Sequence, residues 1–126
     1  MIRTTIRSRF AKSIPVRIRI CRNREEWDAV GKERGIVEWT DVAGACHTVE
    51  RIDLDTGKRT LKEVEVCLRA EYIGAGYIGH EMTHAAFGVR RIMVKRDEET
   101  LALLVGDLCC QFWNWFYKQE ELHKEK

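Results

Sequence analysis

A chain of 126 residues is long enough for one domain with one hydrophobic core and too short for two, so residues 1–126 are expected to form a single domain. Apolar residues make up 44% of the sequence, charged residues 33%, and the net charge is +2, which is typical of a globular protein. No run approaches the roughly 20 apolar residues that cross a bilayer, and residues 1–7 lack the apolar stretch of a secretory signal. A cytoplasmic protein without membrane contact is therefore expected. Five cysteines without a C-x-x-C spacing argue against a disulfide framework or a thiolate metal site.

The N-terminal segment is strongly basic. Residues 1–24 contain eight Lys or Arg and no Asp or Glu. Residues 1–14 are predicted to be a flexible basic arm, and such an arm makes nucleic acid a partner to consider. Because Arg17 and Arg19 alternate with apolar residues, the solvated face of a strand is the favoured interpretation.

The first regular elements follow this arm. Pro15–Arg22 alternates apolar and basic side chains, which predicts a strand with one buried face. Asn23 is a good N-cap for a short helix over Arg24–Val30, which we expect to end near Gly31 or Gly35.

A β-hairpin is predicted next. Val42–Ile52 and Lys62–Arg69 read as strands, and the turn residues at 55–58, including a glycine, lie between them. The chain order is therefore strand, helix, strand, strand, followed by two helices.

The first of those helices carries the clearest chemical signal. His80 and His84 flank Glu81 in an H-E-x-x-H sequence, inside a helix predicted over Ala75–Phe87 and closed by Gly88 as a left-handed cap. Residues at i and i+4 share one helix face, so both imidazoles can bind one metal ion. Zinc accepts imidazole nitrogen, and the carboxylate between the ligands is placed to act as a general base.

The second helix is predicted from apolar residues that recur at spacings of three and four between Leu101 and Phe116. Acidic residues at 97–99 crowd its first turn, and we expect one of these carboxylates to reach the first helix as a third ligand. Position alone does not choose among these carboxylates, and acidic residues also favour a helix N-terminus for electrostatic reasons.

The combined pattern, H-E-x-x-H followed by a glutamate at the start of a helix, resembles the gluzincin group of zinc metallopeptidases. Glu99-Thr100-Leu101-Ala102 matches the E-x-x-A step of several of those families, so the resemblance implies Glu99 as the third zinc ligand with Glu98 in reserve. Residues 72–118 also look like small metallopeptidases encoded by phages and prophages. The resemblance implies an α+β, small zincin-like (minigluzincin) fold. In it, a three- to four-stranded, mostly antiparallel sheet packs on the H-E-x-x-H helix and a long C-terminal helix.

The expected function is zinc-dependent hydrolysis of a peptide or protein substrate, with Glu81 as general base. Tyr72, Tyr77 and His47 are oxyanion-stabilising candidates by residue type, although a structural role is favoured for each. Asp107 is expected to be a surface group or a simple hydrogen-bond acceptor. The alternative is a non-catalytic zinc-binding interaction module that contacts nucleic acid through the basic N-terminus. The natural substrate cannot be read from these residues.

An aromatic run at residues 112–117 continues the last helix. Its main predicted role is core packing. Trp113 and Tyr117 form a second face four residues apart, and we expect a dimer or a protein partner there if that face is exposed.

Overall fold

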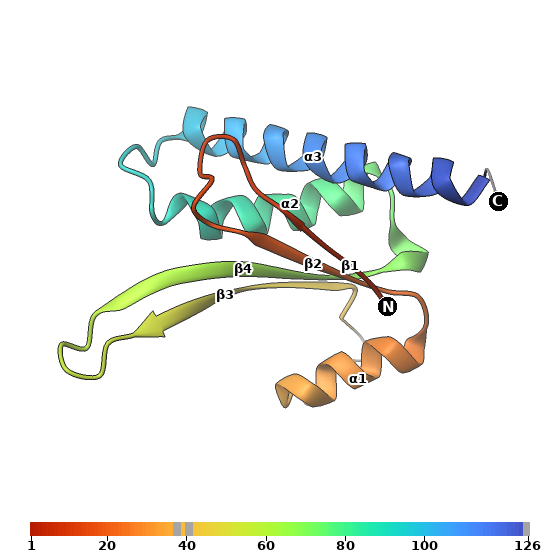
Figure 1. Ribbon diagram of the computed structural model, residues 1–126, viewed down its shortest axis with the longest axis horizontal. Helices are drawn as coiled ribbons and strands as arrows, with labels where there is room; N and C mark the ends of the chain where they lie inside the picture. Colours follow the sequence, from red (N-terminus) through yellow and green to blue (C-terminus); the bar gives the residue numbers. More distant parts are fainter. Residues whose placement is uncertain (37–38, 40–41, 125–126) are drawn as a thin grey trace.

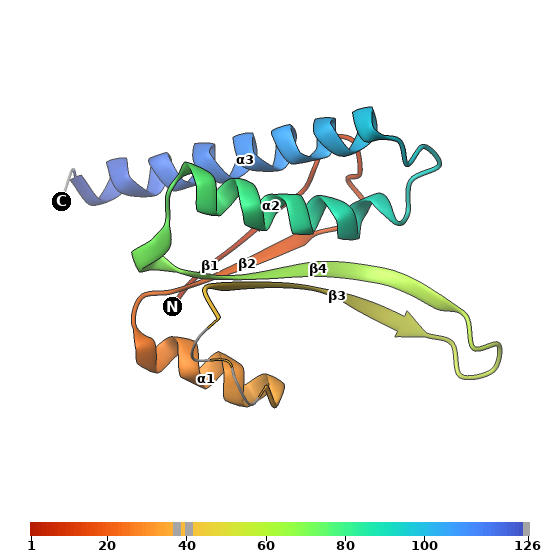
Figure 2. The ribbon, with the colours of Figure 1, turned by 180° about the vertical axis from the view of Figure 1, so that it is seen from behind.

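The computed structural model describes residues 1–36, 39 and 42–124, and for residues 120–124 it describes the backbone alone. It shows an α+β fold (Figure 1). A four-stranded sheet forms one layer. Helices α2 and α3 cover one of its faces and α1 lies on the other, as the view from behind confirms (Figure 2). The elements, in chain order, are β1 (Ile2–Ile6), β2 (Val16–Cys21), α1 (Arg24–Arg34), β3 (Gly44–Ile52), β4 (Arg59–Arg69), a short 3-10 turn (Ala70–Tyr72), α2 (Ala75–Arg90) and α3 (Glu98–Lys124).

The sheet has the order β1-β2-β4-β3. Strands β1 and β2 pair antiparallel, as do β3 and β4, whereas the central pair β2 and β4 is parallel. Two of the three pairings are thus antiparallel, in line with the expected mostly antiparallel sheet. The edges are formed by β1 and β3, because β4 enters the sheet between β2 and β3.

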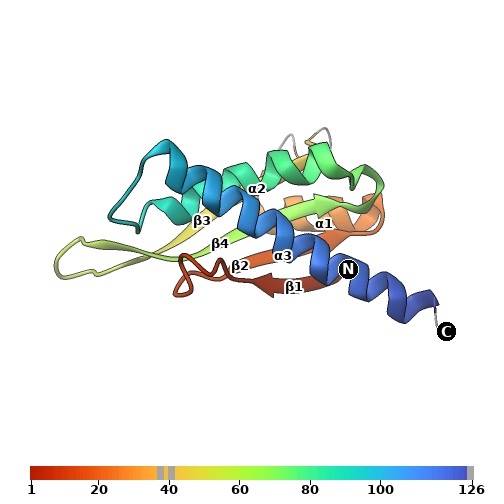
Figure 3. The same cartoon turned by 90° about the horizontal axis from the view of Figure 1, so that it is seen from above.

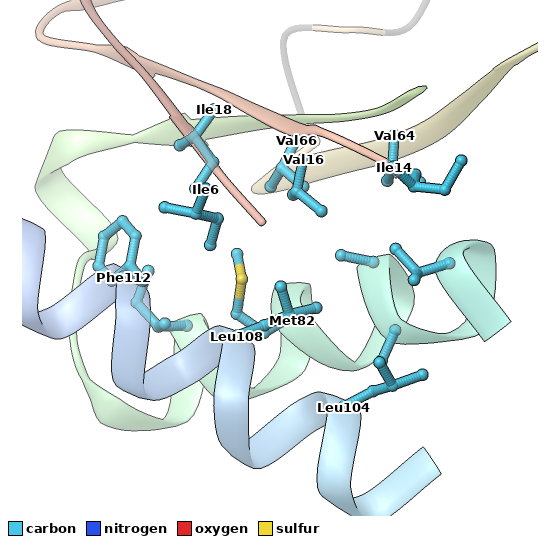
Figure 4. Close-up of a cluster of buried hydrophobic side chains, with 14 of the residues drawn as sticks. Ile6, Ile14, Val16, Ile18, Val64, Val66, Met82, Leu104, Leu108 and Phe112 are labelled. Atoms are coloured by element: carbon cyan, nitrogen blue, oxygen red, sulfur yellow. The ribbon is translucent and has the colours of Figure 1, made fainter. Parts of the chain in front are cut away.

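The main core lies between the sheet and the two helices α2 and α3 (Figure 4). Alternate residues of β2 and β4 point toward the helices, as strand geometry requires. Met82 from α2 and the α3 residues Leu104, Leu108 and Phe112 are fully buried against them. From above, α2 lies over β3 and β4 while α3 crosses diagonally toward β1 (Figure 3). Thus α2 is the helix beside the β3 edge of the sheet.

A smaller cluster lies under α1. The Trp27 and Trp39 rings stack with centroids 4.4 Å apart, and each indole N–H donates to the other residue's backbone carbonyl. Asn23 caps α1 as predicted, because its side chain accepts a hydrogen bond from the Glu26 backbone N–H. Gly35 ends the helix with a left-handed φ of 68°, the second of the two glycines considered from the sequence.

Two expectations about local structure are corrected. Residues 1–14 do not form an isolated arm, because Ile2–Ile6 is strand β1 and pairs residue for residue with β2. Gly88 is not a left-handed cap, since α2 continues to Arg90 and Gly88 is buried within it. A β-carbon at Gly88 would lie 3.1 Å from methyl carbons of Thr48 and Val64. A residue without a side chain is therefore favoured at position 88, because the helix lies close to the hairpin.

Candidate metal centre

The two motif histidines converge on the exposed side of α2. Their Nε2 atoms lie 3.3 Å apart and their ring centroids 4.8 Å apart. The helical repeat places His80 and His84 one turn apart, and Thr83 between them turns its hydroxyl back to the Gly79 carbonyl. Both histidines are exposed, so each ring is accessible to an ion from solvent.

The spacing of the two nitrogens fits a tetrahedral metal ion. Two nitrogens bound to one zinc at about 2.0–2.1 Å lie about 3.3 Å from each other. The same distance between neutral imidazoles also fits one N–H···N hydrogen bond, which would hold the rings in this orientation without metal. The distance between the two nitrogens is therefore compatible with binding of one metal ion by both rings.

Glu81 is buried between the motif helix and the start of β3. Its side chain is 5% exposed, and its Oε1 atom lies 4.0 Å from the His80 Nε2 atom. Burial raises the pKa of Glu81 above its ordinary value, while His80 and His84 act in the opposite direction. A carboxyl group held in this way beside a chelating pair is suited to exchange a proton with a bound solvent molecule.

Close contact with β3 fixes the position of this carboxyl group. A β-carbon at Gly44 would lie 2.6 Å from the Glu81 Oε1 atom and 2.9 Å from the Tyr77 hydroxyl. These distances are shorter than ordinary contacts between side chains. Glycine at position 44, the first residue of β3, therefore leaves room for the Glu81 carboxyl group.

Tyr77 joins the strand ends to the motif helix. Its hydroxyl donates to the Ala43 carbonyl at 2.6 Å and accepts from the Arg69 backbone N–H at 3.0 Å. Burial raises the pKa of Tyr77 to about 12, so the phenol stays protonated at neutral pH. The structural role that the sequence favoured for Tyr77 is thus confirmed, while Tyr72 is exposed and rests beside it with ring centroids 6.0 Å apart.

His47 lies on the wrong side of the sheet to act at this centre. Its neighbour Thr48 faces α2, so by strand alternation His47 points to the α1 face, where its Nε2 atom lies 3.6 Å from a Glu65 carboxylate oxygen. Burial and the charge of Arg34 lower the pKa of His47. Its candidacy as an oxyanion-stabilising residue is therefore wrong.

The expected third ligands lie in the first turn of α3. Glu98 and Glu99 are both exposed, and Asp97 caps this helix by accepting from the Thr100 backbone N–H at 2.9 Å. Among the described residues, no group of three or more His, Cys, Asp or Glu side chains is close enough to hold a metal ion. Helix α2 meets α3 through its buried face, with Met82, whereas the histidines are on the exposed face. The structure brings His80, His84 and Glu81 together, and a third ligand stays a prediction.

Asp107 was underestimated from the sequence. It is buried on α3 and accepts from both the backbone N–H and the Nε of Arg9, at 2.9 and 3.0 Å. Burial by itself raises the Asp107 pKa, but these hydrogen bonds outweigh it and the pKa is lowered. A hydrogen-bonding role was expected for Asp107. Its burial was not expected, because its partner Arg9 lies 98 positions away and the sequence around Asp107 carries no signal of that contact.

Strand β3 runs along the motif helix in the same direction. Its first residue contacts Glu81, Thr48 lies against Gly88, and Arg91 donates to the Thr48 hydroxyl and the Glu50 carboxylate. The sheet edge beside the histidines, which the sequence could not identify, is therefore β3.

Comparison with models of known protein families, with curated proteins and with solved structures returned no match for this chain. Within residues 1–36, 39 and 42–124, none of the helices combines the length and apolar character that crossing a bilayer requires.

Proposed function

We propose that the protein is a zinc-dependent metallopeptidase with a small zincin-like fold, in which His80 and His84 bind the metal ion and Glu81 is the general base. One observation carries the proposal. Two imidazole nitrogens lie at the spacing of ligands to a single tetrahedral ion, and a buried carboxyl group lies 4.0 Å from one of them. The H-E-x-x-H pattern that resembles gluzincins supports the same chemistry.

Zinc, when bound, supplies Lewis-acid polarisation of water and of the substrate carbonyl group. Glu81 takes a proton from the attacking water while the oxygen of that water bonds to the peptide carbonyl carbon. The carboxyl group then gives that proton to the amide nitrogen, and the carbon–nitrogen bond breaks to leave an acid and an amine. Burial of Glu81 keeps its carboxyl group in place through both transfers, which the contact with Gly44 reinforces.

Glu99 is proposed as the third ligand, with Glu98 as the reserve, on the strength of the E-x-x-A resemblance. Among the described residues no third ligand lies close to the two histidines, so recruitment of either carboxylate requires the connector 91–97 and the first turn of α3 to move when metal binds. Metal binding commonly orders such segments, because the ligands gain free energy only when they meet at the ion. Zinc affinity should fall at least about tenfold in Glu99→Gln and remain near the parent value in Glu98→Gln, as measured by competition with a chromophoric chelator.

The substrate is proposed to bind as an extended strand along β3. Strand β3 is an edge of the sheet, so it offers backbone hydrogen-bonding groups to an added strand. Its first residue lies beside Glu81, which places that edge next to the reacting group. Backbone recognition of this kind depends little on side chains, so a protein or peptide of varied sequence is the expected substrate class.

The test is a cleavage comparison on a peptide library, with zinc-loaded wild type against Glu81→Gln. We expect the wild type to cleave and the variant to lose cleavage by a factor of at least about 100 while it still binds one zinc ion. Equal cleavage by both proteins would disprove the role of Glu81. Retained zinc without cleavage of any peptide by the wild type would favour the non-catalytic zinc-binding module instead.

A further inference from the structure

The exposed face of α2 carries more than the two histidines. His80, His84, Phe87 and Arg91 follow one another at spacings of four, three and four, which places them on one side of the helix. Most apolar residues of α2 are buried, yet Phe87 is 46% exposed. A large aromatic side chain is therefore nearly half exposed about one turn beyond the second histidine.

Helix α2 runs beside β3 between Ala43 and Glu50. Tyr77 is tied to Ala43 at one end, and Arg91 is tied to Glu50 at the other. Seven residue steps of strand span about 24 Å, and the fourteen steps of helix between the same anchors span about 21 Å. The two elements therefore stay side by side, and a chain added to β3 would pass along the histidines and then Phe87.

The ring of Phe87 is held from one side. The guanidinium carbon of Arg90 lies 4.8 Å from its centroid, a cation–π contact that covers one ring face. Phe87 lies about 4.5 Å farther along the helix axis than His84, while side chains on one face of an extended chain repeat about every 6.7 Å. The ring thus falls at the level of a side chain one or two residues from the bond being cut.

We propose that Phe87 forms a subsite for a large apolar or aromatic side chain of the substrate, one or two residues from the scissile bond. This inference rests on the proposed function and adds to it a preference that backbone pairing along β3 does not supply. An aromatic substrate side chain packs on the free part of the Phe87 ring and removes apolar surface from water. A substrate with alanine at that position lacks this contact.

Two experiments test the subsite. In the first, cleavage of a peptide library is compared for wild type, Phe87→Ala and Tyr117→Ala, the last being a control that removes an exposed aromatic ring from α3. The wild type should favour aromatic over alanine at one position near the cut by about tenfold, and Phe87→Ala should lose that preference. Tyr117→Ala should keep it.

The second experiment needs no turnover. Zinc-loaded Glu81→Gln is titrated with pairs of dye-labelled peptides that differ at one position, phenylalanine in one peptide and alanine in the other, with that position moved along the peptide from pair to pair. Binding is followed by fluorescence anisotropy, so the position with the largest aromatic preference is found without cleavage. Adding Phe87→Ala should weaken binding of the aromatic peptide about tenfold and leave the alanine peptide nearly unchanged. An unchanged preference in either experiment overturns the subsite. If the wild type cleaves nothing, the peptidase proposal fails while the binding titration still decides the subsite, and binding of neither peptide overturns both.

Discussion

Replacing Gly44 by alanine places a methyl group against the proposed general base. The new β-carbon would lie 2.6 Å from the Glu81 Oε1 atom and 2.8 Å from its carboxyl carbon. Ordinary contact between such atoms begins near about 3.4 Å, so the carboxyl group or strand β3 must move by several tenths of an ångström. Tyr77, whose hydroxyl would be 2.9 Å away, limits the movement on the other side.

We expect Gly44→Ala to lower the free energy of unfolding by about 1–3 kcal/mol, the usual cost of overpacking a well-packed site. For a chain of this size that corresponds to a fall in Tm of about 4–10 °C. Cleavage should fall at least about 100-fold, because a displaced carboxyl group no longer meets the water. Zinc binding should persist, since the three atoms nearest the new methyl group belong to Glu81 and Tyr77 and not to a histidine.

The measurements are thermal unfolding, zinc stoichiometry and peptide cleavage on the same preparations. Gly106→Ala is the matched control, because a β-carbon at this site in the middle of α3 meets nothing within 4 Å. It should raise stability by about 0.5–1 kcal/mol and leave cleavage unchanged. A Gly44→Ala protein with the Tm and activity of the wild type would refute the contact between β3 and Glu81.

Two further predictions concern the fold. Asp107→Asn should lower the free energy of unfolding by about 1–3 kcal/mol, because its charge-assisted bonds to Arg9 are lost, and an unchanged urea midpoint would contradict this. Burial opposes ionisation of Glu65, but contacts with Arg34 and Arg19 prevail and lower its pKa to about 2. Its stabilising effect is therefore complete above about pH 4.5 and is lost as the pH falls toward 2. The stability difference between wild type and Glu65→Gln, from urea titrations at pH 6 and pH 2.5, should shrink at the lower pH, and a constant difference would argue against the ion pairs.

The elements that the sequence predicted well are those with a strong local pattern. Alternation in Pro15–Arg22 predicted β2, and a turn with a glycine between two strand-like runs predicted the β3–β4 hairpin. The H-E-x-x-H helix was placed correctly at its start, and helical spacing was enough to predict that His80 and His84 share a face. Side-chain periodicity is a local property, so it can be read from the chain without knowledge of the fold.

Other features depend on distant contacts and left weak signals. Strand β1 is short and polar at its centre, and it is a strand because its backbone pairs with β2. Glycine is the residue type expected at a helix C-cap, but Gly88 lies where α2 packs closely against the hairpin. Helix α3 packs against the buried face of α2, and the histidines are on the exposed face. Glu98 and Glu99 therefore do not join the histidines in the described structure.

Zinc stoichiometry by native mass spectrometry tests the central claim most directly. The wild type and Glu81→Gln should each bind one zinc ion per chain, whereas His80→Ala and His84→Ala should lose it at the same free zinc concentration. Circular dichroism of all four proteins checks that each is folded. Zinc retained by both His80→Ala and His84→Ala, or no zinc bound by the folded wild type, would contradict a metal centre on this face of α2.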